Sequence, residues 1–268
     1  MTAAARTSTV PAPRGTASRL VSDAAVMTKR NLLKYRRVPT LLVFSTVQPV
    51  MFVLLFVYVF GGAIQVPGAN YTNFLMAGIF VQTSIFGSTQ TGVALADDMN
   101  RGLVDRFRSL PMSRSAVLIG RTLSDSVRNL FVVVLMTGVG YLVGFRFQGG
   151  FVNAIGALLL AVLFGFAFTW ISATIGLSVR DVESAQAATF VWVFPLTFAS
   201  SAFVPVAGFP GWLQAFAKAN PITIAVDAIR ALVLGTPLTP RLWQALAWIF
   251  LLVAIFVPLA VRQYRKAE

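Results

Sequence analysis

Apolar residues in this chain are concentrated in six long stretches, which cover about 41–61, 73–94, 128–145, 152–177, 186–206 and 243–261. A helix needs about 20 predominantly apolar residues to cross the roughly 30 Å hydrocarbon core of a bilayer. The stretches have about this length, and more polar segments separate them. The pattern therefore predicts an all-α integral membrane protein with six transmembrane helices.

Positive charge is distributed unevenly around these stretches. Of the 22 Lys and Arg residues, eight precede the first stretch, six lie between the second and third, and three follow the sixth. Arg180 falls on the same side, and the opposite side holds only Arg146, Lys218, Arg230 and Arg241. Short loops rich in Lys and Arg are retained in the cytoplasm. We therefore expect cytoplasmic N and C termini and a multi-pass protein of a bacterial inner membrane.

The overall composition favours a membrane protein over a soluble one. The chain is 57% hydrophobic with a mean hydropathy of +0.76, which is more apolar surface than a soluble domain of 268 residues can bury. The net charge of +13 lies beside the stretches, where anionic lipids attract it, so the expected partners are membrane lipids and not a nucleic acid. Cys and His are both absent, which excludes disulfides and thiolate or imidazole metal ligands.

The segment before the first stretch divides into two parts. Residues 1–17 lack the apolar core of a signal peptide and are expected to form a disordered cytoplasmic tail. Residues 18–38 place apolar and small side chains on one helical stripe, namely Val21, Ala24, Ala25, Thr28, Leu32 and Tyr35. Basic side chains surround the stripe, which predicts a helix lying on the membrane surface. A solvated basic linker is the alternative.

The second and fifth stretches carry unusual side chains for lipid-facing helices. The second is polar between Gln82 and Thr91, which predicts burial in protein, in a dimer interface or against a water-filled path. The fifth places Phe190, Phe194 and Phe198 near one face. Interhelical hydrogen bonding and ordinary packing are the alternatives to a functional role for these residues.

The chain lacks the chemistry of a self-sufficient transporter or an enzyme. It has no phosphate-binding G-x-x-x-x-G-K-[ST] loop, and the charged residues are expected at or beyond the ends of the six stretches. Coupled carriers generally need ionisable groups inside the membrane. No carboxylate pair, catalytic Ser set or metal cluster can be assembled. The sequence therefore predicts a passive subunit, without enzymatic activity of its own, that another protein drives.

The loop between the second and third stretches is the predicted contact with such a driver. Residues 101–110 form a short amphipathic helix whose apolar stripe comprises Leu103, Val104, Phe107 and Leu110. Asp97 and Asp98 are expected at the positive end of its dipole, and Pro111 ends it. Such a helix suits a groove in another protein, although it could instead lie on the membrane.

The run from Arg101 to Pro111, with the sequence RGLVDRFRSLP, resembles a loop of the permease subunits of type-2 ABC exporters. It is most similar to the daunorubicin/doxorubicin-resistance permeases, in which a Gly precedes an Asp-Arg-apolar-Arg-small-(Leu/Met)-Pro string. The sequence Asn220-Pro221-Ile222, followed by Arg230, resembles the second signature of that family. The resemblance extends from the basic helix to Arg262, in segment order as well as in motifs.

The resemblance implies a role for each segment. Residues 18–38 would be the connecting helix, 39–268 the six-span domain, and about 207–241 an extracellular segment with two re-entrant helices, Gly211 to Ala219 and Ile222 to Leu234. The helix at about 101–110 would be the coupling helix on an ATPase subunit, with contacts from Arg101, Leu103, Val104, Phe107, Arg108 and Leu110. Two ATPase copies, which bind ATP and Mg, and a second permease, identical or homologous, would complete the exporter. The chain itself would hold no cofactor.

The implied function is ATP-driven export of hydrophobic or amphiphilic small molecules such as drugs and antibiotics. Amphiphiles need apolar contact and a few polar groups, so the substrate route is predicted between the second and fifth stretches. Its candidate residues are Gln82, Thr89, Phe190, Phe194 and Phe198. Two alternatives stay open: export of a glycolipid or polysaccharide precursor by the same fold, and a receptor-like or structural membrane subunit without transport activity.

Overall fold

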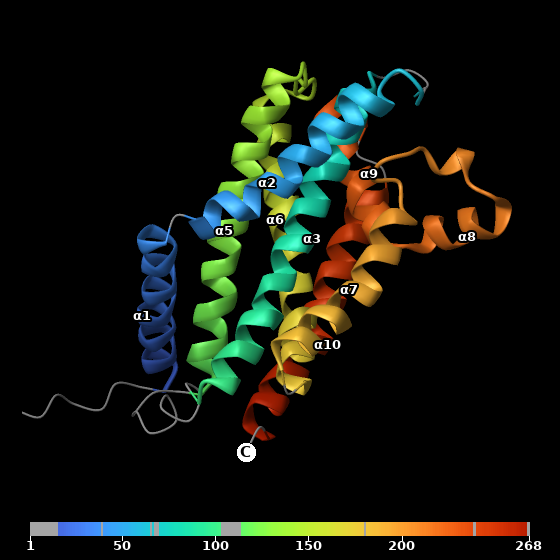
Figure 1. Cartoon of the computed structure of the whole chain (residues 1–268). Coiled ribbons are helices and arrows are strands. Elements are labelled where there is room, and N and C mark those ends of the chain that lie inside the picture. The colour runs from blue at the N-terminus through green and yellow to red at the C-terminus, as the bar shows by residue number, and fades with distance from the viewer. Residues whose placement is uncertain are drawn as a thin grey trace, which may run out of the picture.

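The computed structural model describes residues 16–38, 40–64, 66, 70–102, 114–179, 181–237 and 240–266. Within these ranges the chain is helical and contains no strand (Figure 1), so the all-α prediction is confirmed for them. The helices are α1 Thr16–Arg37, α2 Thr40–Leu54 with its π-helical continuation Leu55–Phe60, α3 Tyr71–Asn100, α5 Arg114–Leu142, α6 Gly150–Ser178, α7 Val182–Phe198, α8 Gly211–Ala219, α9 Pro221–Leu234 and α10 Pro240–Lys266.

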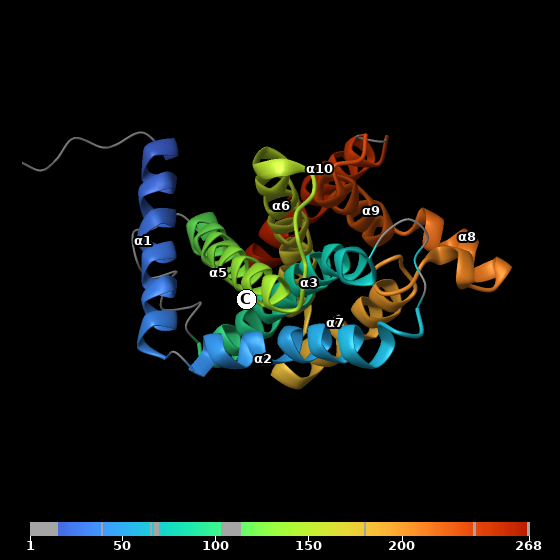
Figure 2. The same ribbon diagram turned by 90° about the horizontal axis from the view of Figure 1, so that it is seen from above.

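Helix α3 forms the centre of the bundle. In the view from above (Figure 2), α2, α5, α6, α7 and α9 surround it, and the polar side chains from Gln82 to Thr89 are buried. Its closest neighbour is α6, because Gly92 lies against the backbone of Ser172 and Gly176 lies against the backbone of Gly92. The predicted burial of this polar helix is therefore confirmed: small and polar residues let it contact protein on almost every side.

Three described helices are long and apolar enough to cross a membrane by themselves. They are Ala116–Leu142 in α5, Gly150–Ser178 (α6) and Pro240–Lys266 (α10), and Ser45–Phe60 is a shorter apolar helix. Helix α3 has ample length but carries the polar residues described above, and α7 has only 17 residues. A multi-pass helical membrane protein is thus supported by composition and length.

Helix α7 ends earlier than the apolar stretch that predicts it. The stretch was expected to continue to about residue 206, but the helix ends at Phe198. The Asn220 side chain donates hydrogen bonds to the carbonyl oxygens of Leu196, at 2.7 Å, and Ala199, at 3.0 Å. The amide of Ser201 donates to the Thr223 hydroxyl at 3.1 Å. These bonds from the segment around α9 satisfy the end of α7, and the chain turns there.

Helix α1 runs obliquely beside the lower part of α5 (Figures 1 and 2). Ala24 and Met27 are buried against α5, where the backbone of α1 comes close to Gly120. The predicted helix over 18–38 is therefore present. Ala24 of the predicted stripe is buried against α5, whereas Val21 (68% exposed) and Ala25 of the same stripe are exposed on the monomer, and their contact with the membrane stays a prediction. Packing on α5, rather than apolar character alone, selects the buried face. Of the predicted tail, residues 1–15 lie outside the described residues.

Helices α8 and α9 occupy the positions of the two predicted short pieces. Trp212 on α8 is 75% exposed, whereas α9 is largely buried against α3, α6 and α10. The predicted pair on α9 is confirmed, because Arg230 contacts Asp227 at 2.9 Å. The Arg230 guanidinium also lies 3.6 Å from the ring centre of Phe74 and donates to the Ser201 carbonyl at 2.7 Å. This arginine joins α9 to α3 and to the end of α7.

The segments richest in Lys and Arg meet at one end of the bundle. Helix α1, the end of α3, the start of α5, the junction of α6 with α7 and the C-terminal end of α10 all lie toward the bottom of Figure 1. The connection between α5 and α6 lies at the opposite end. The helical arrangement therefore places the cation-rich segments at one end of the bundle and the connection that carries Arg146 at the other. This separation agrees with the distribution of charge predicted from the sequence.

Candidate functional site

Helix α5 carries three charged side chains that pack against neighbouring helices. Arg121, Asp125 and Arg128 belong to the segment Ala116–Leu142, which is long and apolar enough to span. Asp125 is completely buried and Arg128 is only 6% exposed. All three lie at or before the start of the predicted stretch 128–145, but their burial by protein was not predicted. Polar partners on α1 and α3 make their burial tolerable.

Asp125 is the hydrogen-bonding centre of this cluster. One carboxylate oxygen accepts a hydrogen bond from the Tyr35 hydroxyl of α1 at 2.7 Å. The other accepts from the Thr91 hydroxyl of α3 at 2.5 Å and from Nε of Arg121 at 3.2 Å. Burial, reinforced by the charge of Asp125, raises the pKa of Tyr35 to about 12. The hydroxyl therefore stays protonated and remains a donor at physiological pH.

Arg128 makes a different set of contacts. Its Nη2 donates to the carbonyl oxygen of Gly87 at 2.5 Å and to Oδ1 of Asn129 at 3.3 Å. Its guanidinium also lies 5.7 Å from the ring centre of Tyr35. No ion pair joins it to a carboxylate of the described residues, whereas Arg121 pairs with Asp125 and, at 3.9 Å, with Asp98. Arg128 is thus a buried cation held by neutral acceptors.

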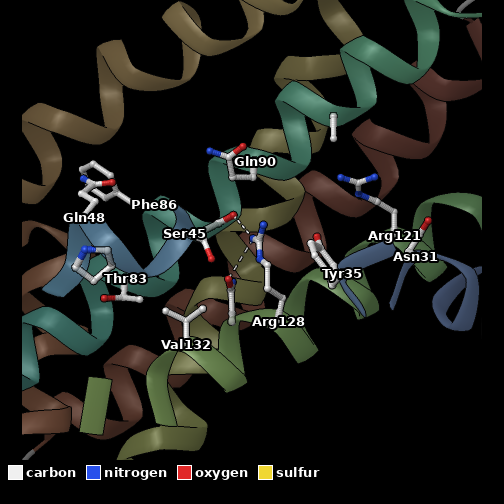
Figure 3. A pocket seen from close by; sticks show the side chains of 14 residues that line it. Asn31, Tyr35, Ser45, Gln48, Thr83, Phe86, Gln90, Arg121, Arg128 and Val132 are labelled. Atoms are coloured by element: carbon white, nitrogen blue, oxygen red, sulfur yellow. Dashed lines mark hydrogen bonds between the residues drawn. The ribbon is translucent and has the colours of Figure 1, made fainter. Parts of the chain in front are cut away.

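A cavity of about 300 Å³ lies beside this cluster, between α1, α2, α3 and α5. Figure 3 shows the end of Arg128 among Ser45, Gln90 and Tyr35, with its two hydrogen bonds dashed. The lining is mixed polar and apolar, and consists of Asn31, Tyr35, Ser45, Gln48, Pro49, Thr83, Phe86, Gly87, Gln90, Ala94, Arg121, Arg128, Asn129 and Val132. Gln48 and Gln90 are exposed, so the cavity opens to the outside of the monomer beside them.

The residues predicted for the substrate route lie together on the neighbouring side of α3. Phe86 of α3 contacts Phe190 and Phe194 of α7, with ring centres 5.9 and 5.5 Å apart, and Phe198 stacks on Phe194. Gln82 and Thr89 are buried, and the side-chain oxygen of Gln82 accepts no hydrogen bond among the described residues. These five predicted residues do not line the cavity, although Phe86 separates it from the aromatic face. Their role in transport stays a prediction.

Most of the predicted coupling residues, namely Leu103, Val104, Phe107, Arg108 and Leu110, lie outside the described residues. Arg101 is described and exposed, and its Nε contacts Oδ1 of Asp97 at 2.8 Å. The placement of the two aspartates was wrong, since both belong to the C-terminal end of α3. There they can neutralise neighbouring arginines: Asp97 pairs with Arg101, and Asp98 pairs with Arg121.

Sequence reasoning missed the cluster around Asp125, although one signal was available. Arg121 and Asp125 are four residues apart, a spacing that brings opposite charges together on a helix. Arg121 and Arg128 also fit the predicted cation-rich loop between the second and third stretches, so this spacing alone does not indicate that they are buried. The participation of Tyr35 and Thr91 had no local signal, because they are distant from Asp125 in sequence and meet it only through helix packing.

Comparison with known proteins identifies the family to which this chain belongs. Residues 23–234 match the model of the ABC-2 type transporter family. The chain is 37% identical over 239 residues to the daunorubicin resistance ABC transporter permease protein DrrB1 of Streptomyces coeruleorubidus, covering 88% of this chain and 84% of that protein. It is 27% identical over 261 residues to the probable doxorubicin resistance ABC transporter permease protein DrrC of Mycobacterium tuberculosis, covering 97% and 94%.

A more distant relative carries a more general name. The putative transport permease ycf38 of Cyanophora paradoxa is 28% identical over 216 residues, covering 79% of this chain and 74% of that protein. The family match includes α9 and the cluster around Asp125, and the resemblance noted in the sequence is confirmed. The chain therefore belongs to the ABC-2 type transporter family, as a membrane permease of an ABC transport system.

Proposed function

We propose that this chain is the permease subunit that, with a separate ATPase, exports hydrophobic or amphiphilic small molecules such as daunorubicin or doxorubicin from a bacterial cell. The observation that carries the proposal is the 37% identity, over 88% of the chain, to a daunorubicin resistance permease. Two features of the fold support it. The aromatic face of α7 offers apolar contact, and the buried Gln82 oxygen on α3 offers a polar group without a hydrogen-bond partner among the described residues.

The proposed topology has six spans in the inner membrane, with cytoplasmic termini. The spans would be α2 with its π-helical continuation, α3, α5, α6, α7 and α10, and α8 with α9 would be the extracellular re-entrant segment. The clustering of the cation-rich segments at one end of the bundle supports this orientation. A polar α3 can span because protein, rather than lipid, surrounds it.

Membership of the family implies an ATPase partner and a permease partner. The proposed complex has two ATPase copies and two permeases, identical or homologous, and the loop after α3 is the proposed contact with the ATPase. ATP and Mg would be bound by that partner. An aromatic anchor commonly dominates a small interface. We therefore expect Phe107→Ala to weaken docking of the ATPase by about 2 kcal/mol.

Co-purification of the ATPase with the permease measures this docking directly. Association and drug-stimulated ATP hydrolysis should both fall for Phe107→Ala, while the amount of permease in the membrane stays at the wild-type level. Arg101→Ala removes an exposed side chain whose partner Asp97 is half-exposed, and we expect it to weaken co-purification less than Phe107→Ala does. Undiminished co-purification of Phe107→Ala would remove this side chain from the interface.

The decisive experiment is a resistance assay in a drug-sensitive bacterium that expresses the permease with its ATPase. The panel should contain anthracyclines, other hydrophobic drugs and a hydrophilic antibiotic as a control. Resistance to the amphiphilic members, lost when the ATPase cannot hydrolyse ATP, is the expected result. Absence of resistance, together with altered surface glycolipid or polysaccharide, would favour precursor export instead. No change in either readout would favour a subunit without transport activity.

The substrate route can be tested in the same assay. Phe194→Ala and Gln82→Ala should change the relative resistance among drugs, because pocket residues contact each compound differently. Expression and basal ATP hydrolysis should stay near wild type. Leu246→Ala, on the exposed surface of α10, is a matched apolar control. A uniform loss of resistance in proportion to protein level would show that Phe194 and Gln82 serve packing alone.

A further inference from the structure

Among the described residues, Arg128 has no carboxylate within ion-pair distance, and it shares the nearby Asp125 with Arg121. Its guanidinium is buried and lines the cavity between α1, α2, α3 and α5. Both carboxylate oxygens of the neighbouring Asp125 are engaged by Tyr35, Thr91 and Arg121. Both hydrogen bonds that Arg128 makes with the described residues come from Nη2 and go to neutral acceptors. The N–H groups of Nε and Nη1 make none with these residues. Asp125 is engaged directly by Arg121 and so compensates the buried charge of Arg128 only in part, and the adjoining cavity provides room for an anion.

The surroundings of the cavity also favour an anion. Its lining contains two arginines and no carboxylate. Side chains that can donate further hydrogen bonds come from three other helices: Asn31 of α1, Gln48 of α2 and Gln90 of α3. Helix α1 adds exposed basic side chains nearby in the chain, including Lys29 and Arg37. A cationic amphiphile would find no free carboxylate here, whereas a phosphate would find a guanidinium and several neutral donors.

Arg128 is the last charged residue of α5 and lies where the apolar part of the helix begins. Residues 129–142, which follow it to the end of the helix, carry no charged side chain and extend about 20 Å at 1.5 Å per residue. Arg121 and Asp125 precede it. Large apolar side chains close to the lining residues in sequence are exposed, namely Val47 and Met51 on α2 and Phe131 and Val134 on α5. A lipid phosphate at Arg128 would therefore have an apolar surface beside it for its acyl chains.

We propose that this cavity binds the phosphate-bearing head group of a membrane phospholipid, with Arg128 as the principal counter-ion. The assignment of this lipid to the inner leaflet rests on the proposed topology. The binding of the head group in the cavity does not depend on that topology. The site differs from the predicted drug route on the α7 side of α3. Because the head group would contact residues of α1, α2, α3 and α5, it would hold the connecting helix against the bundle.

Native mass spectrometry of the purified full chain in detergent tests the proposal. The probe is dioleoylphosphatidylglycerol, compared with dioleoylglycerol, which has the same chains without the phosphate, and with inorganic phosphate. We expect one saturable phosphatidylglycerol site on the wild-type chain and none of comparable affinity for dioleoylglycerol. Millimolar inorganic phosphate should leave the lipid bound. Displacement of the lipid by millimolar phosphate would identify a free-anion site and overturn the lipid assignment.

Arginine variants test whether the lipid binds in the cavity beside Arg128. Arg128→Gln should weaken phosphatidylglycerol binding about tenfold or more, because the head group loses a charge-assisted hydrogen bond. Arg128→Lys, which keeps the charge, should recover most of the affinity. Arg265→Gln removes an exposed cation at the same end of the bundle and should leave binding unchanged. An equal loss of phosphatidylglycerol affinity in Arg128→Gln and Arg265→Gln would mean that overall charge determines binding, and would contradict the proposed site.

A second variant covers the case in which Arg128→Gln does not fold. Gln90→Trp places a large side chain at the exposed edge of the cavity and leaves every contact of Asp125 and Arg128 in place. It should also weaken phosphatidylglycerol binding about tenfold. Gln186→Trp, at an exposed position of α7, is the matched control and should bind as the wild type does. Wild-type affinity of Gln90→Trp would overturn the proposed position of the head group.

Discussion

Asp125 shows at the scale of single residues how charge is accommodated inside this helical bundle. It joins α1 through Tyr35, α3 through Thr91 and its own helix through Arg121. The acceptor oxygens are satisfied on both sides, so the carboxylate contributes fixed contacts among three helices. Removing one partner of such a group leaves the remaining charges buried without compensation.

Asp125→Asn is therefore expected to destabilise the protein strongly. The two neighbouring arginines would lose their nearest carboxylate, and breaking a buried ion pair costs about 3–5 kcal/mol. The midpoint of thermal unfolding in detergent should fall clearly below that of the wild type. Asp97→Asn removes a carboxylate from a partly exposed pair with Arg101 and should change the midpoint little. Similar midpoints for both variants would contradict the central role of Asp125.

Tyr35 makes stability depend on pH in the alkaline range. Its pKa rises from 10.0 to about 12 on folding because burial and Asp125 disfavour the phenolate. The unfolded chain therefore loses this proton first as pH rises. The contribution of Tyr35 is complete below pH 10 and is lost as pH increases through about 12. Unfolding measured between pH 9 and pH 12 should show a steeper loss for wild type than for Tyr35→Phe, and parallel curves would contradict the linkage.

At the scale of helices, α3 and α6 form the tightest pair because glycine lets their backbones meet. A Cβ atom at Gly176 would collide with the backbone oxygen of Gly92. The same residue type at position 138 of α5 has open space around its Cβ position. The two positions therefore separate the effect of close packing from the general effect of a helical glycine.

Gly176→Ala is expected to destabilise the bundle by about 1–3 kcal/mol, since the added methyl forces two backbones apart. Gly138→Ala should be neutral or stabilising, by up to about 1 kcal/mol, because alanine favours helix. Thermal unfolding in detergent gives both comparisons. The proposal of a glycine-dependent α3–α6 contact fails if the two variants behave alike.

For the whole molecule, the main expectation concerns orientation in the membrane. The cation-rich segments lie at one end of the bundle, and the chain contains no cysteine. Single cysteines at the exposed Asn100, the last residue of α3, and at Gly208, before α8, therefore report on opposite ends. An impermeant thiol reagent added to intact cells should label position 208 and spare position 100. Labelling of position 100 alone would mean that the topology is inverted.

The local sequence was sufficient to predict the elements that depend on neighbouring residues. The apolar runs predicted α5, α6 and α10, and the break at Asn220-Pro221 predicted separate helices α8 and α9. The spacing of Asp227 and Arg230 predicted their ion pair. The end of α7 could not be predicted in this way, because Asn220, distant in sequence, caps its carbonyl groups. For the same reason the part of the α1 stripe that α5 buries is decided by the close approach of α1 to Gly120.

The amino-acid sequence by itself determined the membrane class, the helical elements and the segregation of positive charge, because length, hydropathy and charge act locally along the chain. Only the tertiary structure decided which charges are buried. Arg121 and Arg128 have the same side chain and both line the cavity, yet one is paired with Asp125 and the other faces neutral acceptors. The difference arises because helices α1, α3 and α5 bring Tyr35, Thr91 and Gly87 to fixed places around Asp125 and Arg128. Contacts between residues distant in sequence, and not residue type, set the electrostatics of the cavity.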